Sequence, residues 1–325
     1  MDVVDHIIHG NYERFPAAIV NMIISRVTSS AKLSSQVCNR VEENAFSFSL
    51  ENKIGAGGFG EVFSGTYLDK KAAIKRVNES LHPDDSAFDL SSLRRELAVL
   101  SLLRAQNLLK YYGYSYKEPY YFIITELAHC SLRSFIENGR LAALDWIAKS
   151  RIAIEICRGM MVLHNAGVAH RDLKTDNILM VEEDGTLVAK IGNFGISRSV
   201  GSNQFLTRAI GTTNYMSPEL LESNEVQADS KLLKADVYAF GCILWALCAN
   251  EEPHVGQTHA AVQRMVDASK QKSVFGKYHT PLKIPASCPK SWRKLLIACW
   301  EYHADCRPHF RIILSHLMGE STKVR

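Results

Sequence analysis

Apolar and polar residues alternate along the chain from Phe46 onward, which is the pattern of β-strands with one buried face. The segments FSFSLENKIG, EVFSGTYLD and KAAIKRV predict three successive strands joined by short turns. A helical pattern follows over residues 91–104. KYYGYSYK and YYFIITEL, which are separated by Glu118 and Pro119, restore the alternation. The pattern therefore predicts five strands and one helix.

Helical periodicity dominates after Ser131, apart from a hairpin predicted around Glu183-Asp184-Gly185. The most apolar stretch, residues 239–249, is too short to span a bilayer and predicts a buried helix. The predicted fold class is therefore α+β, with a small sheet-rich lobe, a larger helical lobe and a cleft between them.

Before the first predicted strand, one stripe of apolar residues has helical spacing. It predicts an amphipathic helix that packs on the main domain, although membrane or partner binding is an alternative. The helix has Pro16 near its start, and its apolar positions are Phe15, Ala18, Ile19, Met22 and Ile23.

Composition narrows the partners and the compartment. The 325 residues carry a net charge of +4 and contain no run of five like charges. Charge therefore gives no reason to expect nucleic acid or an acidic membrane as the main partner. The eight cysteines include no CxxC pair of zinc or redox spacing, which favours reduced thiols. The first residues resemble no signal peptide. We therefore expect a cytoplasmic protein without a transmembrane segment.

The segment IGAGGFGEV, residues 54–62, places glycines at positions 55, 57 and 60. Glycines allow the backbone to approach phosphate oxygens closely. A dinucleotide site would need a helix directly after Gly60, whereas the following residues predict a returning strand, so this alternative is excluded. A glycine-rich hairpin without a ligand stays open on this motif alone.

Lys75 ends the apolar segment Ala72-Ala73-Ile74-Lys75, and its ammonium needs partners if it lies on one face of a sheet. Glu96 on the predicted helix can supply a carboxylate, and nucleotide phosphates can supply the rest. A solvated strand end for Lys75 and an exposed helix position for Glu96 are the alternatives.

The string His170-Arg171-Asp172-Leu173-Lys174-Thr175-Asp176-Asn177 favours phosphoryl transfer. Asp172 can accept the proton of a substrate hydroxyl, and Lys174 can contact the transferring phosphoryl group. Asn177 can bind magnesium through its amide oxygen. A charged surface loop is the alternative, and it is disfavoured because the string follows the earlier motifs in order.

These motifs together resemble those of eukaryotic protein kinases, over about residues 46–319. Ser217-Pro218-Glu219 resembles the family's Ala-Pro-Glu motif, Asp236 the aspartate of a buried helix, and Arg307 the arginine that pairs with Glu219. The resemblance implies a bilobal kinase fold, with a five-stranded antiparallel N-lobe bearing one main helix and a mostly helical C-lobe. It implies an N-lobe over residues 45–127 and a C-lobe over 131–319, within a kinase domain of 45–319. Residues 1–44 then form a partly helical extension and 320–325 a tail.

Finer features are similar to the serine/threonine type, within the tyrosine-kinase-like group. Lys174 and Thr212 resemble residues of serine/threonine kinases, so protein serine and threonine hydroxyls are the implied substrates. Thr207 is the implied phosphorylation site, and Ser199, Ser202 and Thr213 are the next candidates.

The same resemblance implies ATP and Mg²⁺ as cofactors, with Mn²⁺ as the alternative metal. Thr125 corresponds to the gatekeeper, and Glu126 to Ala128 to the hinge that hydrogen-bonds adenine. Val62, Ala73 and Leu179 would enclose the adenine ring. The implied nucleotide-binding residues are Ile54, Gly55, Gly57, Gly60, Val62, Ala73, Lys75, Thr125, Glu126, Ala128 and Leu179.

Asn193 departs from the family pattern, because kinases have a magnesium-binding aspartate at this position of the Asp-Phe-Gly triplet. Asn193 and Asn177 are then the implied metal ligands. Loss of a unit charge about 4 Å from a cation removes roughly 4 kcal/mol at an effective dielectric constant near 20. A loss of that size in the transition state lowers the rate on the order of a thousandfold.

The sequence thus predicts an ATP-dependent protein serine/threonine kinase whose activity Asn193 impairs. The main alternative is a pseudokinase that acts as a nucleotide-binding signalling scaffold, and a deliberately inactivated variant fits the same residues. A nucleotide-binding module unrelated to kinases would make the string from His170 to Asn177 a coincidence.

Overall fold

The computed structural model describes residues 38–57, 60–78, 90–193, 213–222, 229–268 and 280–321, apart from the side chains of 90–92, 94–96, 229, 320 and 321. The predicted helix with the apolar stripe lies outside these residues. The chain divides into two compact units. The N-terminal unit includes residues 38–129, 165–167 and 192–193, and the C-terminal unit includes 130–164, 168–191 and 213–321.

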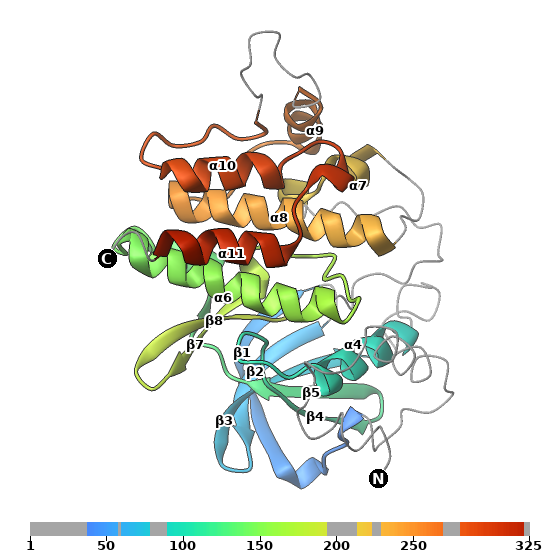
Figure 1. The fold of residues 1–325 in the computed structure, drawn as a ribbon. Coiled ribbons are helices and arrows are strands. Elements are labelled where there is room, and N and C mark those ends of the chain that lie inside the picture. The colour runs from blue at the N-terminus through green and yellow to red at the C-terminus, as the bar shows by residue number, and fades with distance from the viewer. Residues whose placement is uncertain are drawn as a thin grey trace, which may run out of the picture. The chain divides into compact units, whose positions relative to one another are not determined.

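The N-terminal unit contains a five-stranded antiparallel sheet in the order β1-β2-β3-β5-β4 and one long helix, α4 (Figure 1). This arrangement confirms the five strands and the helix predicted from the alternation. Their bounds are β1 Phe46–Gly57, β2 Gly60–Tyr67, β3 Lys70–Asn78, α4 Leu90–Leu102, β4 Tyr111–Lys117 and β5 Tyr120–Glu126.

The strand register separates two faces of this sheet. Ala72 and Ile74 of β3 pack with Phe122 and Ile124 of β5 in an apolar cluster, together with Val41. Phe46 and Phe48 at the start of β1 extend over the same face, with ring centroids 5.5 and 5.7 Å from that of Phe122. Because successive side chains of a strand point to opposite faces, the intervening residues of β3 and β5 lie on the other face of the sheet.

Residues 38–41 contact β4 of this sheet shortly before β1 begins. Arg40 forms a parallel bridge with Tyr114, and Val41 donates its backbone N–H to the Tyr114 carbonyl at 2.8 Å. Cys38 is fully buried, and its carbonyl accepts a hydrogen bond from the Tyr111 hydroxyl at 2.6 Å. Gly113 leaves room for this contact, because an added Cβ would lie 2.5 Å from the Asn39 carbonyl oxygen. These residues are part of the core of the unit, while the predicted domain boundary at 45 stays a prediction.

The C-terminal unit is mainly helical, which confirms the α+β class. Its one small sheet has the order β6-β7-β8 in the described residues, and Asp184 and Gly185 turn between β7 and β8 with φ of 48° and 75°, as the predicted hairpin requires. The bounds are β6 Cys130–Ser131, α5 Leu132–Glu137, α6 Trp146–Asn165, β7 Ile178–Glu183, β8 Thr186–Ile191, α7 Pro218–Glu222, α8 Asp229–Ala249, α9 His259–Ala268, α10 Lys290–Cys299 and α11 Phe310–Ser321.

Helix α8 forms the centre of the C-terminal unit and packs against α10 (Figure 1). It includes the predicted buried helix at 239–249, but it begins ten residues earlier. Its segment from Ser230 to Ala249 is long and apolar enough to cross a membrane by length and composition, yet 83% of that window is buried inside the protein. Burial in the core of the C-terminal unit therefore explains why α8 is so apolar.

Candidate functional site

The predicted site residues fall in both units, and each set is described by itself. The N-terminal unit holds the predicted nucleotide-binding residues up to Ala128, together with Lys75 and Asn193. The C-terminal unit holds Asp172, Lys174, Asn177 and Leu179.

In the N-terminal unit, the register places four predicted site residues on one face of the sheet. Val62 pairs with Lys75 across β2 and β3, and Ala73 pairs with Thr125 across β3 and β5. Directly paired residues of antiparallel strands share a face, as do residues two apart on one strand. Val62, Ala73, Lys75 and Thr125 therefore lie together, opposite the apolar cluster, and all four are partly exposed.

The glycines of the IGAGGFGEV segment differ in what they accommodate. Gly60 has φ of +126°, and an added Cβ would lie 2.2 Å from the Arg76 carbonyl oxygen, so the protein itself requires glycine there. At Gly55 the nearest atom of the described residues to an added Cβ is 3.9 Å away. Contacts with the described residues thus do not explain why position 55 is a glycine, whereas close approach of a ligand would explain it. Gly57 pairs with Gly60, and Ile54 is 55% exposed on β1.

Glu126, the last residue of β5, has both its carboxylate and its backbone groups hydrogen-bonded within the protein. Its pairing with Ala72 places its side chain on the face opposite Thr125, where Oε1 accepts the Lys110 backbone N–H at 2.6 Å. The Glu126 N–H donates to the Lys110 carbonyl at 2.9 Å. Ala128 follows two residues later and is partly exposed.

Lys75 makes no ion pair with any described side chain. The side chain of Glu96 on α4 lies outside the described residues, so the Lys75–Glu96 pair stays a prediction. Phe194, Ser199, Ser202, Thr207 and Thr212 also lie outside them.

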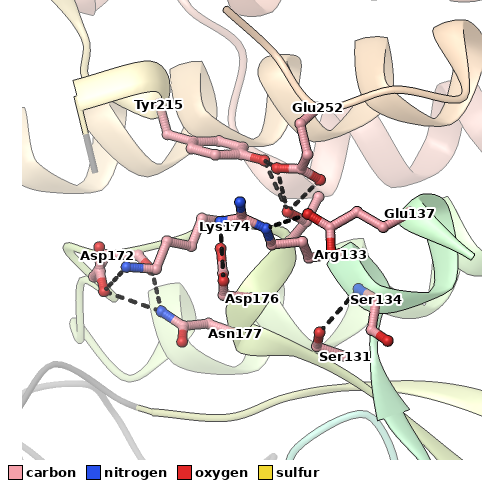
Figure 2. A network of polar contacts seen from close by, with 11 residues as sticks. Ser131, Arg133, Ser134, Glu137, Asp172, Lys174, Asp176, Asn177, Tyr215 and Glu252 are labelled. Carbon is pink, nitrogen blue, oxygen red and sulfur yellow. Dashed lines mark hydrogen bonds and ion pairs between the residues drawn. The ribbon is translucent and has the colours of Figure 1, made fainter. Parts of the chain in front are cut away.

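The catalytic residues predicted from the string at His170 lie close together (Figure 2). Lys174 Nζ is 2.8 Å from Asp172 Oδ2. Asn177 Nδ2 donates to the same carboxylate oxygen at 3.1 Å and to the Asp172 carbonyl at 2.6 Å. The Asp172 carboxylate is thus held from two sides, and its side chain keeps 22% exposure for a reactant.

The backbone before Asp172 is held by a carboxylate on α8. Arg171 has φ of 69°, which is unfavourable for a residue with a long side chain. Asp236, which is 2% exposed, accepts the backbone N–H groups of His170 at 2.8 Å and Arg171 at 2.9 Å. It also contacts His164 Nε2 at 2.9 Å. These bonds stabilise a conformation that the chain alone would avoid.

A second network, which sequence reasoning missed, holds the middle of the same loop (Figure 2). Thr175 donates its hydroxyl to the Glu252 carboxylate at 2.7 Å, and the Tyr215 hydroxyl donates to Glu252 at 2.7 Å. Burial raises the pKa of Glu252. Arg133 approaches from α5, with Nη1 3.4 Å from Asp176 Oδ1. Because the partners of Glu252 are 37 and 77 positions away, local sequence carries no signal for it.

Other predicted residues have clear places. Leu179 lies on β7, between Ser131 of β6 and Lys190 of β8, and is partly exposed. Thr213 is 5% exposed and its Oγ1 lies 3.3 Å from His259 Nδ1. Asn193 is exposed, with φ of 54°.

The predicted pair of Arg307 with Glu219 is confirmed. The two terminal guanidinium nitrogens of Arg307 donate to the two carboxylate oxygens of Glu219 at 2.7 and 2.8 Å. The guanidinium also donates to the carbonyls of Lys234, Glu301 and Tyr302, so all five of its N–H groups have acceptors.

Comparisons with known proteins agree with this geometry. The chain matches the model of the protein kinase domain over residues 48–318. It is 32% identical, over 81% of its length, to a probable LIM domain-containing serine/threonine-protein kinase of Dictyostelium discoideum, of which the match covers 25%. It is 29% identical, over 82% of its length, to a serine/threonine/tyrosine-protein kinase of Arabidopsis thaliana, of which the match covers 65%. The chain thus spans about a quarter to two thirds of the length of these relatives.

Proposed function

The chain belongs to the protein kinase family, and on that premise we propose that it binds ATP with a divalent metal and transfers the γ-phosphoryl group to serine or threonine hydroxyls of proteins. We propose further that Asn193 lowers the rate of this transfer. The observation that carries the proposal is the Asp172 carboxylate, held 2.8 Å from Lys174 Nζ and 3.1 Å from Asn177 Nδ2.

The residues present fit a nucleotide and a metal. The position beside Gly55, which is open among the described residues, would admit a phosphate close to the backbone, and Lys75 on the same sheet would meet its charge. Carboxylate and amide oxygens are the ligands that Mg²⁺ prefers, and Asn177 and Asn193 would supply amide oxygens. A bound metal would neutralise charge that develops on the phosphate oxygens during transfer.

Four residues of the C-terminal unit have separate roles in the proposed phosphoryl transfer. Asp172 accepts the proton of the substrate hydroxyl as general base. Lys174, whose Nζ lies 2.8 Å from Asp172 Oδ2, donates to the developing phosphoryl charge. The amide nitrogen of Asn177 fixes the orientation of Asp172, and Asp236 keeps the backbone of the loop in place.

The test is phosphate transfer from radiolabelled ATP to protein substrates, with Mg²⁺ and with Mn²⁺, in the original protein and in Asn193→Asp. Restoring the charge strengthens metal binding in the transition state. We therefore expect Asn193→Asp to be faster by up to roughly a thousandfold. The matched control, Asp172→Asn in the Asn193→Asp protein, should abolish the gain.

The outcomes separate the two candidate functions. Transfer by both proteins, with phosphoserine and phosphothreonine as products, supports a slow kinase. Transfer by Asn193→Asp alone supports the second candidate, a nucleotide-binding pseudokinase scaffold, which the amide at position 193 favours. Absence of transfer from both proteins, despite nucleotide binding, contradicts the kinase proposal.

A further inference from the structure

Two cysteine thiols of the C-terminal unit lie in contact. Cys248, in the last turn of α8, has its Sγ 3.4 Å from the Sγ of Cys288, which precedes α10. Both residues are buried, with 3% and 5% exposure. A disulfide has an S–S length of about 2.05 Å, so the sulfurs need to approach by roughly 1.4 Å to bond.

The segment that carries Cys288 is fixed against α8 and α10. Trp245 on α8 donates its indole N–H to the Lys283 carbonyl at 2.9 Å. Arg293 on α10 donates to the Pro285 carbonyl at 3.0 Å. These bonds flank Cys288 and keep its sulfur beside that of Cys248, so the contact follows from the local architecture.

The two thiols differ in proton affinity. The Cys248 thiol donates to Cys288 Sγ, and this hydrogen bond lowers the pKa of Cys288, with a further lowering by the positive charge of Arg293. The same hydrogen bond and burial raise the pKa of Cys248. Lys149, which is 5% exposed and donates to Asn250 at 2.7 Å, adds a second positive charge near Cys248. Positive charges near a cysteine favour the thiolate, which is its nucleophilic form.

We propose that Cys248 and Cys288 form a dithiol site that a hydroperoxide oxidises to an intramolecular disulfide. The Cys288 thiolate attacks one peroxide oxygen, the O–O bond breaks, and Cys288 becomes a sulfenic acid. The hydroxide released from hydrogen peroxide takes the proton of Cys248. The Cys248 thiolate then attacks the Cys288 sulfur, the S–S bond forms and the S–O bond breaks. The second hydroxide takes the proton that Cys288 had lost, so two thiols and one peroxide give one disulfide and two waters.

Other cysteines of the chain provide internal comparisons. Cys157 and Cys299 are fully buried, and burial raises the pKa of both thiols. They should stay reduced because the thiolate is the nucleophile. Cys306 is exposed and serves as the accessible control.

The experiment uses the full chain, reduced and then treated with hydrogen peroxide at neutral pH. Free thiols are alkylated in denaturant, and the protein is digested without reduction for mass spectrometry. We expect the alkylatable thiols to fall from eight to six, a cross-linked peptide pair containing Cys248 and Cys288, and full reversal by dithiothreitol. The readout is independent of kinase activity, so it stands or fails separately from the proposed function.

Variants define the roles of the two sulfurs. Cys248→Ser should leave Cys288 as a sulfenic acid that dimedone traps, whereas Cys288→Ser should give neither adduct nor cross-link. Cys306→Ser should keep the cross-link. The proposal is overturned if Cys248 and Cys288 of the original protein both stay alkylatable while Cys306 is oxidised. It is equally overturned if their cross-link forms only after the protein has been unfolded.

Discussion

At the scale of single residues, Asn193 is a predicted metal ligand that carries no charge, and its backbone matters as much as its side chain. Its φ of 54° lies in the left-handed region, where asparagine and aspartate are the most tolerated residues after glycine. Replacement by aspartate therefore changes the charge without straining the backbone. For this reason Asn193→Asp is a clean probe of the missing carboxylate.

Arg307 gives a prediction for stability. Its side chain is fully buried and meets Glu219 with two bonds. Lysine lacks the planar fork that serves these acceptors. We expect Arg307→Lys to lower the free energy of unfolding by about 1–3 kcal/mol, since carbonyl oxygens that the buried guanidinium serves lose their donors. Urea denaturation measures the change. Lys117→Gln is the control, because its pair with Glu43 at 3.4 Å is exposed and should be worth less than about 1 kcal/mol. A similar small loss in both variants would contradict this account.

His254 predicts a dependence on pH. It is 6% exposed, and its Nδ1 has no hydrogen-bond partner among the described residues. Burial lowers its pKa from 6.5 to about 4. Between these pH values His254 is protonated in the unfolded chain but neutral in the folded chain. The free energy of unfolding therefore decreases as the pH falls from about 6.5 to about 4. The shift corresponds to up to roughly 3 kcal/mol.

The measurement is urea denaturation of His254→Asn at pH 7 and pH 4.5. Asparagine tolerates the φ of 54° at this position. The variant should lose less stability on acidification than the original protein. His303→Asn, at an exposed position, should retain the original dependence. An unchanged pH dependence in His254→Asn would exclude His254 as its source.

The sequence supplied the residues of the catalytic string, but it could not supply what holds them. Asp172, Lys174 and Asn177 were predicted because they lie within six positions and match a known pattern. Glu252 and Tyr215 were missed because only the tertiary fold brings them to Thr175. Long-range polar contacts of this kind have no local periodicity to reveal them.

At the scale of elements, α8 shows why prediction from periodicity falls short. The apolar stretch at 239–249 predicts the second half of the helix only, because the first half carries charged residues such as Lys231, Lys234 and Asp236. Asp236 is buried because it binds the backbone at His170 and Arg171, a contact that composition cannot reveal. In contrast, the strands of the N-terminal sheet alternate clearly, and all five were predicted.

The hydrogen bond between Thr175 and Glu252 leads to a prediction for the stability of two variants. Thr175→Val should lower the free energy of unfolding by about 1–3 kcal/mol, since it deprives the buried Glu252 carboxylate of one of its two hydroxyl donors. Glu252→Gln is the matched variant, since its amide oxygen can still accept both hydroxyls, and it should cost less. Equal losses in both variants would show that the hydroxyl of Thr175 is not the stabilising group.

Glu252→Gln has a second expected effect. A carboxyl whose pKa rises on folding binds more protons when folded, so stability falls as the pH rises from 4.5 through the raised pKa. The glutamine variant should lose that decline, which urea denaturation at several pH values measures.

At the scale of the whole molecule, the match to the kinase family begins at residue 48, yet residues 38–41 already contact β4. A protein that starts at Phe46 loses the burial of Cys38 and Val41 and uncovers the edge of β4. We expect it to be less stable than one that starts at Gln36, by about 2–4 kcal/mol, as judged by urea denaturation.

A point variant tests the same contact in the full chain. Gly113→Ala would place its Cβ 2.5 Å from both Asn39 O and Val41 Cγ1, and should displace residues 38–41 from β4. Gly319→Ala is the control, because an added Cβ there meets no described atom within 4 Å and lies in a helix, where alanine is favoured. If Gly113→Ala were as stable as the original, the contact would contribute little.

The shared face of Val62, Ala73, Lys75 and Thr125 restricts how the length of this gene product can change over evolution. A single residue inserted within β3 would rotate every later side chain of that strand by half a turn about its axis. Lys75 would then exchange places with the apolar neighbours that fill the other side. Loops can gain or lose residues one at a time, whereas the middle of β3 can tolerate only paired insertions.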